Sequence, residues 1–275
     1  MPHTLNAGRP YTAGAASRYI ETLLRRGQVT FSLAALMAAT SLTRIAARNQ
    51  LLRLGPTVTR VAPRQDFFLI VSPEHQIMGA PPATWWLDAY FQWLGRPYYL
   101  ALQSAAAEYG STAQAVQVVQ VMTDKPRRPL VLGRIRVEFH VKQTVSQTPV
   151  HPSANAYAPL WVSTPAATVF DLLRYATSIG GLARAEETAV PLLAKLKRTD
   201  LTDALKAARE LPTLVRAAML FRNNGYAALA DRTIAEAKRC DDKRLALLLA
   251  KADPGGMPRS EPTANTGDQA RKAKQ

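Results

Sequence analysis

Arginine side chains dominate the charge of the first quarter of this 275-residue chain. Residues 1–64 contain nine arginines, no lysine and one carboxylate, Glu21, so their formal charge is nine minus one, +8, of the +15 of the whole chain. A guanidinium group can donate two parallel hydrogen bonds to a phosphate or to the O6 and N7 atoms of guanine. Their concentration in one segment indicates a polyanionic partner for the N-terminal part of the chain.

Three short helices and a hairpin are expected to position these arginines. Apolar spacing predicts a helix over residues 17–26, a second that Ser32 caps and that ends near residue 40, and a third from residue 41 to the Gly55-Pro56 stop. Two β-rich runs, 57–62 and 67–71, follow as a hairpin. Two helices joined by a short turn and followed by a hairpin are typical of a winged helix-turn-helix.

The third helix is expected to bury one face and to expose the N-terminal half of the other, which is the part of a recognition helix that enters the major groove. The face expected to be buried carries Leu42, Ile45, Asn49 and Leu52, and Ala47 is expected to face outward. The predicted DNA-binding residues of this helix, the wing and the first helix are Arg25, Arg26, Ser41, Thr43, Arg44, Arg48, Gln50, Arg60 and Arg64.

The rest of the chain predicts a second, larger domain. The Pro- and Gly-rich stretch 72–82 is expected to be a linker without regular structure that lets the two domains fold separately. Helical patterns over 83–94 and 100–109, strand patterns over 116–122 and 130–141, a loop over 149–159 and five helical patterns between 164 and 239 follow.

The expected fold class is α+β: an N-terminal winged helix-turn-helix followed by a mixed α/β and then largely helical C-terminal domain. The expected boundaries are 1–78 for the DNA-binding domain, 79–252 for the second domain and 253–275 for a disordered tail.

A second basic cluster brackets the predicted strands of the second domain. Its members are Lys125, Arg127, Arg128, Arg134 and Arg136. It is a candidate extension of the nucleic-acid path.

The alternative function is a metal-dependent nucleic-acid-processing enzyme with a nuclease-like C-terminal domain. It would combine Glu138, His140 and Lys142 on one strand with Asp88 or Asp171. Alternating polar residues are equally ordinary on a half-exposed strand, and no two of the scattered histidines stand at metal-ligand spacing. We therefore expect no catalytic residue, no metal and no cofactor.

Two further absences limit the class of protein. The single cysteine, Cys240, provides neither a disulfide nor a cysteine-based metal site within one chain, which favours the cytoplasm. No apolar run reaches the roughly 18 residues that a membrane span requires. A membrane protein is therefore not expected.

An ordered series of short motifs resembles the AbiEi family of antitoxins. The series runs through residues 19–31 and 67–75, Gly79-Ala80-Pro81-Pro82 with Trp86, Arg96-Pro97-Tyr98-Tyr99, Val119 to Thr123, Ser163-Thr164-Pro165, Asp171-Leu172-Leu173 and Gly180-Gly181-Leu182. The resemblance covers roughly residues 17–196 and continues more weakly to residue 226. It implies a winged helix that represses its own operon at inverted repeats in double-stranded DNA. It also implies a C-terminal domain that counteracts an AbiEii-type nucleotidyltransferase toxin in phage defence, without a stable complex.

Overall fold

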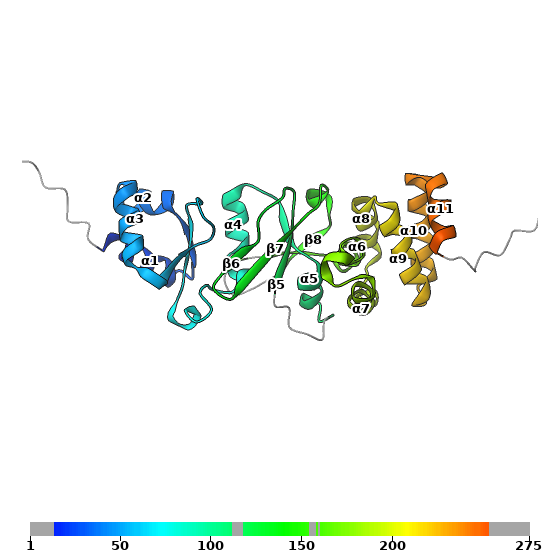
Figure 1. Cartoon of the computed structure of the whole chain (residues 1–275), viewed down its shortest axis with the longest axis horizontal. Coiled ribbons are helices and arrows are strands. Elements are labelled where there is room, and N and C mark those ends of the chain that lie inside the picture. Colours follow the sequence, from blue (N-terminus) through cyan, green and yellow to red (C-terminus); the bar gives the residue numbers. More distant parts are fainter. Residues whose placement is uncertain (1–13, 112–117, 154–157, 159, 253–275) are drawn as a thin grey trace, which may run out of the picture.

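The structure, a computed structural model, describes residues 14–111, 118–153, 158 and 160–252. The chain forms an elongated body whose three parts follow one another in sequence order (Figure 1). Three helices with a small sheet lie at one end, a six-stranded sheet lies in the middle, and a group of helices forms the other end. The predicted α+β class with a largely helical C-terminal region is confirmed.

The N-terminal part has the element order of a winged helix, and we use that name for it on the basis of its element order alone. Its elements are α1 (Ala15–Arg25), β1 (Thr30–Ser32), α2 (Leu33–Thr40), α3 (Arg44–Arg53), the 3-10 helix η1 (Gly55–Thr57), β2 (Val58–Arg60) and β3 (Phe67–Ile70). β3 lies between β1 and β2 in an antiparallel sheet. The predicted cap of α2 is confirmed, because Ser32 Oγ accepts from the Ala35 N–H at 3.1 Å.

The buried face of α3 differs from the prediction. Ala47 and Leu51 are buried, and the exposed residues include Ile45 at 76%, Asn49, and Leu52 at 80%. The prediction was wrong because it began the helix at Ser41. Ser41 has a left-handed φ of 55°, and Leu42 enters the core from the turn, so the helix starts at Arg44 with a different phase.

The middle part is a mixed sheet with the strand order β6-β7-β5-β4-β9-β8. Its strands are β4 (Tyr98–Leu100), β5 (Val118–Thr123), β6 (Leu130–Leu132), β7 (Ile135–Val141), β8 (Val150–Ser153) and β9 (Leu160–Ser163). β5 pairs in parallel with β7, as β4 does with β9. β8 lies in the stretch that was expected to be a loop. As an edge strand it tolerates Pro152, which has no N–H to donate.

Helices cover both faces of this sheet. The 3-10 helix η3 (Ala83–Trp85) and α4 (Leu87–Leu94) pack on one face, in a cluster with Tyr98 and Leu100. α5 (Leu102–Glu108) and α6 (Pro165–Arg174) pack on the other, in a cluster with Tyr99 and Met122. Successive residues of β4 thus alternate between two cores.

Residues 72–82 are packed rather than free. They contain the 3-10 helix η2 (Pro73–His75), and Ala80 is fully buried. The Met78 carbonyl accepts from the Arg134 N–H at 2.9 Å, and a Cβ on Gly133 would stand 2.2 Å from that carbonyl oxygen. The close backbone approach and the φ of 59° at Gly133 both call for glycine. The segment is therefore held against the β6–β7 turn.

One hydrophobic cluster, which we call the shared core, joins the winged helix to the middle part. It contains Val29, Val61, Phe67 and Leu69 of the winged helix together with Trp86, Tyr90 and Phe91 around α4 and Val121 and Val137 of the sheet. The Phe67 ring centroid lies 5.5 Å from that of Tyr90 and 5.3 Å from that of Trp93. This packing does not favour the expectation that the two domains fold separately.

The C-terminal part is helical. After the 3-10 helices η4 (Val145–Gln147) and η5 (Ala176–Ile179), its elements are α7 (Leu182–Leu193), α8 (Arg198–Ala208), α9 (Leu211–Asn223), α10 (Ala227–Cys240) and α11 (Asp242–Ala252). α11 was not predicted, and the expected disordered tail lies outside the described residues. No helix in the described ranges is both long and apolar enough to cross a membrane.

Candidate nucleic-acid interface and a buried ion pair

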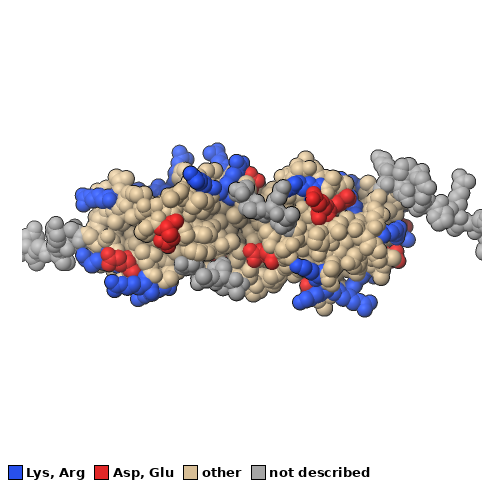
Figure 2. Space-filling view, turned by 90° about the horizontal axis from the view of Figure 1, so that it is seen from below, with Lys and Arg blue, Asp and Glu red and all other residues tan. Residues whose placement is uncertain are grey.

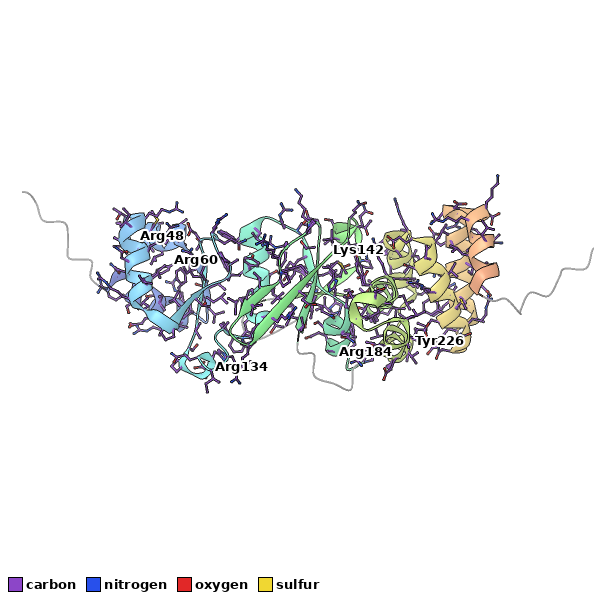
Figure 3. All side chains as sticks on the ribbon, in the orientation of Figure 1. Arg48, Arg60, Arg134, Lys142, Arg184 and Tyr226 are labelled. Atoms are coloured by element: carbon purple, nitrogen blue, oxygen red, sulfur yellow. The ribbon has the colours of Figure 1, made fainter. Side chains whose placement is uncertain are left out.

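Three arginines of the winged helix converge on one carboxylate, that of Asp66. Arg48 Nη2 lies 3.1 Å and Arg60 Nη2 lies 3.8 Å from Asp66 Oδ1, and Arg44 Nη2 donates to Oδ2. The three arginine side chains remain 36–60% exposed, whereas Asp66 is 23% exposed. We call this group the Asp66 cluster; it presents a net positive charge to solvent. Arg48 and Arg60 are labelled in Figure 3.

Two elements bring this cluster together. Arg44 and Arg48 are four residues apart and therefore share one side of α3. Arg60 ends β2, where its guanidinium lies 5.2 Å from the centroid of the Phe68 ring on the neighbouring strand. Asp66 is the last residue of the turn between β2 and β3, which we call the wing turn. Its backbone carbonyl accepts from the Leu33 N–H at 2.9 Å. The wing and the helices thus share one polar anchor.

Five other predicted DNA-binding residues lie elsewhere on the winged helix, and all are exposed. Ser41 and Thr43 form the turn before α3, where Thr43 Oγ1 accepts from a helix N–H. Arg64 lies in the wing turn with a left-handed φ of 64°. Arg25 and Arg26 lie at the end of α1. In the described part of the chain, none of the five belongs to the Asp66 cluster.

Gln50, the remaining predicted residue, has a structural contact. Its Oε1 accepts from the Ala16 N–H at 2.9 Å, in the first turn of α1, where backbone donors lack helical partners. We expect Gln50→Ala to lower the free energy of unfolding by about 1 kcal/mol and to leave DNA affinity unchanged. Urea denaturation and a DNA titration of the same sample measure both. Lost DNA affinity at unchanged stability would instead assign Gln50 to base reading.

Sequence reasoning missed two residues that share the exposed side of α3, Ile45 and Asn49. Beside them, a groove of about 390 Å³ lies between α3 and the wing. It is lined by Arg48, Asn49, Leu51, Leu52, Gly55, Val58, Arg60 and Phe68. An asparagine can pair with adenine, and an apolar side chain can contact the thymine methyl group. The signal that would have placed them is the Thr43 cap, because it sets the phase of the helix.

Arg127 of the second basic cluster is held by aromatic residues of the shared core. Its Nη2 donates to the Tyr90 hydroxyl at 2.6 Å, and its guanidinium lies 5.4–5.9 Å from the ring centroids of Tyr90, Phe91 and Phe139. The Tyr90 hydroxyl in turn donates to Gln65 Oε1 of the wing turn at 2.7 Å, and burial raises its pKa. Arg127 therefore connects the sheet to the wing.

The other members of the second basic cluster are exposed. These are Lys125, Arg128, Arg134 and Arg136. Arg136 pairs with Glu138 at 2.9 Å. In Figure 3, Arg134 lies near the lower edge of the middle part, apart from Arg48 and Arg60. Figure 2 likewise shows Lys and Arg in separate groups along the body, with carboxylates and neutral residues between them.

The middle part contains a buried ion pair. Lys142 Nζ lies 2.8 Å from Asp171 Oδ1, and the two side chains are 2% and 1% exposed. The Tyr99 hydroxyl donates to the second carboxylate oxygen at 2.8 Å, and burial together with the Asp171 charge raises its pKa well above the usual value. Figure 3 shows Lys142 between the sheet and the helices. The pair ties α6 to β4 and to the chain just after β7.

The residues of the nuclease alternative do not form one accessible site. Glu138 pairs with an arginine, and Lys142 is enclosed in the buried ion pair. Asp88 accepts from the Tyr98 hydroxyl at 2.9 Å in the core on the opposite face of the sheet. His140 is half-buried, and burial lowers its pKa. Among the described residues, no group of three His, Cys, Asp or Glu side chains is placed to hold a metal ion.

Residues 99–223 match the family model of the AbiEi antitoxin C-terminal domain. We call residues 99–223 the AbiEi segment. The match runs from β4 to α9, so it includes the buried Tyr99, Lys142 and Asp171. The predicted resemblance to the AbiEi antitoxins is confirmed for residues 99–223. The winged helix lies outside the match. No curated protein matches the chain significantly.

Motif residues of the AbiEi segment shape its fold. Thr164 Oγ1 accepts from the Ala167 N–H at 3.4 Å and caps α6, and Pro165 occupies the first helical position. Gly180 and Gly181 both have a φ of 100°, which turns the chain from η5 into α7. The motifs thus specify helix starts and turns, and with Asp171 the buried ion pair, rather than an exposed reacting group.

Proposed function

We propose that this chain is a DNA-binding repressor of its own operon and the antitoxin to an AbiEii-type nucleotidyltransferase toxin. The observation that carries DNA binding is the grouping of Arg44, Arg48 and Arg60 on one exposed surface of a winged helix. The AbiEi segment supports the antitoxin role. The protein acts in the cytoplasm in phage defence, and it counteracts the toxin without a stable complex.

The geometry of α3 suggests how double-stranded DNA is read. The N-terminal half of a recognition helix enters the major groove, which brings Arg44 and Arg48 to the base edges. An arginine fork there selects guanine. The wing arginines, Arg60 and Arg64, contact phosphates or the adjacent minor groove and set the register.

A promoter fragment that carries inverted repeats tests this function and its alternative together. The purified chain is expected to shift the fragment in a gel and to leave it intact in the presence of Mg²⁺. Intact DNA with a salt-dependent shift supports the repressor. Cleavage that needs the metal and is lost in Glu138→Ala would instead support the nuclease.

Alanine substitutions of Arg44 and Arg60 are expected to change DNA binding in different ways. Arg44→Ala should cost about 1–3 kcal/mol at the cognate repeat and relax the preference at one base pair, with a smaller loss on random DNA. Arg60→Ala should weaken binding to cognate and random DNA equally, and it should reduce the slope of log affinity against log salt by about 0.9. Titrations of both duplexes across a salt series measure these effects.

The matched control for both variants is Arg239→Ala, which removes an exposed arginine from α10 at the opposite end of the molecule (Figure 1). It should leave both duplexes bound as in the parent. Equal losses on cognate and random DNA for Arg44→Ala would show that α3 does not read the sequence.

The antitoxin role is testable in cells that carry the neighbouring toxin gene. The double variant Arg44→Ala with Arg48→Ala keeps the whole chain, including the shared core and the AbiEi segment. It is expected to lose repression of a reporter and still to protect the cells, with the toxin expressed from an independent promoter. Loss of protection with an unchanged amount of folded antitoxin would contradict this division of labour.

A further inference from the structure

We propose that Asp66 determines the DNA specificity of the winged helix. It is inferred to act as a positioning residue that holds Arg44 and Arg48 in one orientation and competes with phosphates for all three arginines of the Asp66 cluster. This inference rests on the proposed function. It assigns a role in DNA specificity to a carboxylate, whereas the expected charged contacts with DNA are arginines.

Both oxygens of the Asp66 carboxylate face arginines. Oδ2 accepts from Arg44, and Oδ1 faces Arg48 at 3.1 Å and Arg60 at 3.8 Å. In each of these contacts the arginine uses Nη2, so the other N–H groups of each guanidinium remain available to a ligand. A guanidinium held from behind in this way offers its free edge to a base in a defined direction.

The position of Asp66 is fixed from both sides. Its carbonyl accepts from the Leu33 N–H at 2.9 Å at the start of α2. The neighbouring Gln65 accepts from the Tyr90 hydroxyl at 2.7 Å, and that hydroxyl accepts from Arg127. The backbone at Asp66 is therefore held to α2 and, through Gln65, to the shared core, which places the carboxylate next to the three arginines.

The negative charge has opposite consequences for the two kinds of DNA. Binding to random DNA depends on the number of phosphates that cations neutralise, and a fixed carboxylate removes one positive charge from that number. Binding to a cognate site depends on guanidinium groups that are oriented to donate hydrogen bonds to base edges. The carboxylate holds the guanidinium groups of Arg44 and Arg48 in such an orientation. Asp66 should therefore weaken the random complex more than the cognate complex, because in the cognate complex the ordering of the two arginines offsets part of the cost of its charge.

The variant Asp66→Asn tests this proposal. At 0.1 M salt, its affinity for random DNA is expected to rise about tenfold, with a salt dependence steeper by about 0.9 in log–log slope. Cognate affinity should rise much less, so the ratio of cognate to random affinity should fall by about three- to tenfold. Fluorescence anisotropy with both duplexes measures the ratio, and circular dichroism checks the fold.

Two further variants separate position from charge. Glu21→Gln removes one exposed negative charge from α1 of the same winged helix without touching the Asp66 cluster, and it should leave the ratio unchanged. Asp66→Glu keeps the charge and displaces the carboxylate by one methylene, so it should lower cognate affinity while random affinity stays near that of the parent chain.

The outcomes distinguish this inference from the proposed function. A parent chain that prefers no DNA sequence overturns the function itself. A parent chain with clear preference, combined with an Asp66→Asn ratio equal to that of Glu21→Gln, overturns the role of Asp66 and leaves the repressor intact.

Discussion

Lys142→Ala is expected to lower the free energy of unfolding by about 3–5 kcal/mol, because it leaves the Asp171 carboxylate buried without its counter-ion. The carboxylate is 1% exposed and would keep only the Tyr99 hydroxyl among the contacts described above. Because the pair joins α6 to the sheet, the loss should affect the whole AbiEi segment. Urea denaturation followed by far-UV circular dichroism gives the free energy.

Two controls identify the cause of that loss. Lys206→Ala removes a lysine whose ion pair with Asp203 is exposed, and it should cost less than about 1 kcal/mol. The triple variant Lys142→Met, Asp171→Leu, Tyr99→Phe replaces the buried polar group by apolar side chains and should stay within about 2 kcal/mol of the parent. A loss below 1 kcal/mol for Lys142→Ala would mean that water reaches Asp171.

Phe67→Ala is expected to cost about 3–5 kcal/mol and to destabilise the winged helix and the middle part together. Phe67 is 4% exposed and packs on Tyr90 and Trp93 in the shared core. All four tryptophans of the chain lie between residues 85 and 161, outside the winged helix. Their fluorescence therefore monitors the middle part, and its urea midpoint should fall although the substitution lies in the wing sheet.

The control for this variant is Phe31→Ala, which truncates an equally buried phenylalanine in the winged helix's own core. The native tryptophan emission should shift to longer wavelength in Phe67→Ala, because the ring beside Trp93 is lost, and should not shift in Phe31→Ala. An unchanged tryptophan midpoint in Phe67→Ala would show that the winged helix unfolds independently.

Local signals in the sequence predicted the elements well where the physics is local. The Ser32 cap and the hairpin after residue 56 are encoded by neighbouring residues, and the structure has the corresponding elements. The predicted buried face of α3 was wrong because it depends on the residue at which the helix begins. The helix begins at Arg44, after the Thr43 cap, so every later side chain points in another direction than in a helix that begins at Ser41. β8 was missed because proline content outweighed its place at a sheet edge.

The site was predictable only in part. Charge composition pointed to Arg44, Arg48 and Arg60, which the structure groups, because a surplus of one charge is visible along the chain. The pairing of all three with Asp66 depends on how the wing folds back onto α3, and nothing in the local pattern encodes that contact. The pairing of Lys142 with Asp171, 29 residues later, is tertiary in the same sense.

The shared core also bears on what recombination between genes can exchange. A junction near residue 78 separates Phe67 from Tyr90, and it separates Gln65 from the hydroxyl that donates to it. A junction after α4 keeps those contacts but cuts α4 from the sheet on which it packs. Neither junction leaves two complete surfaces, so the winged helix and the AbiEi segment are expected to be inherited as one piece.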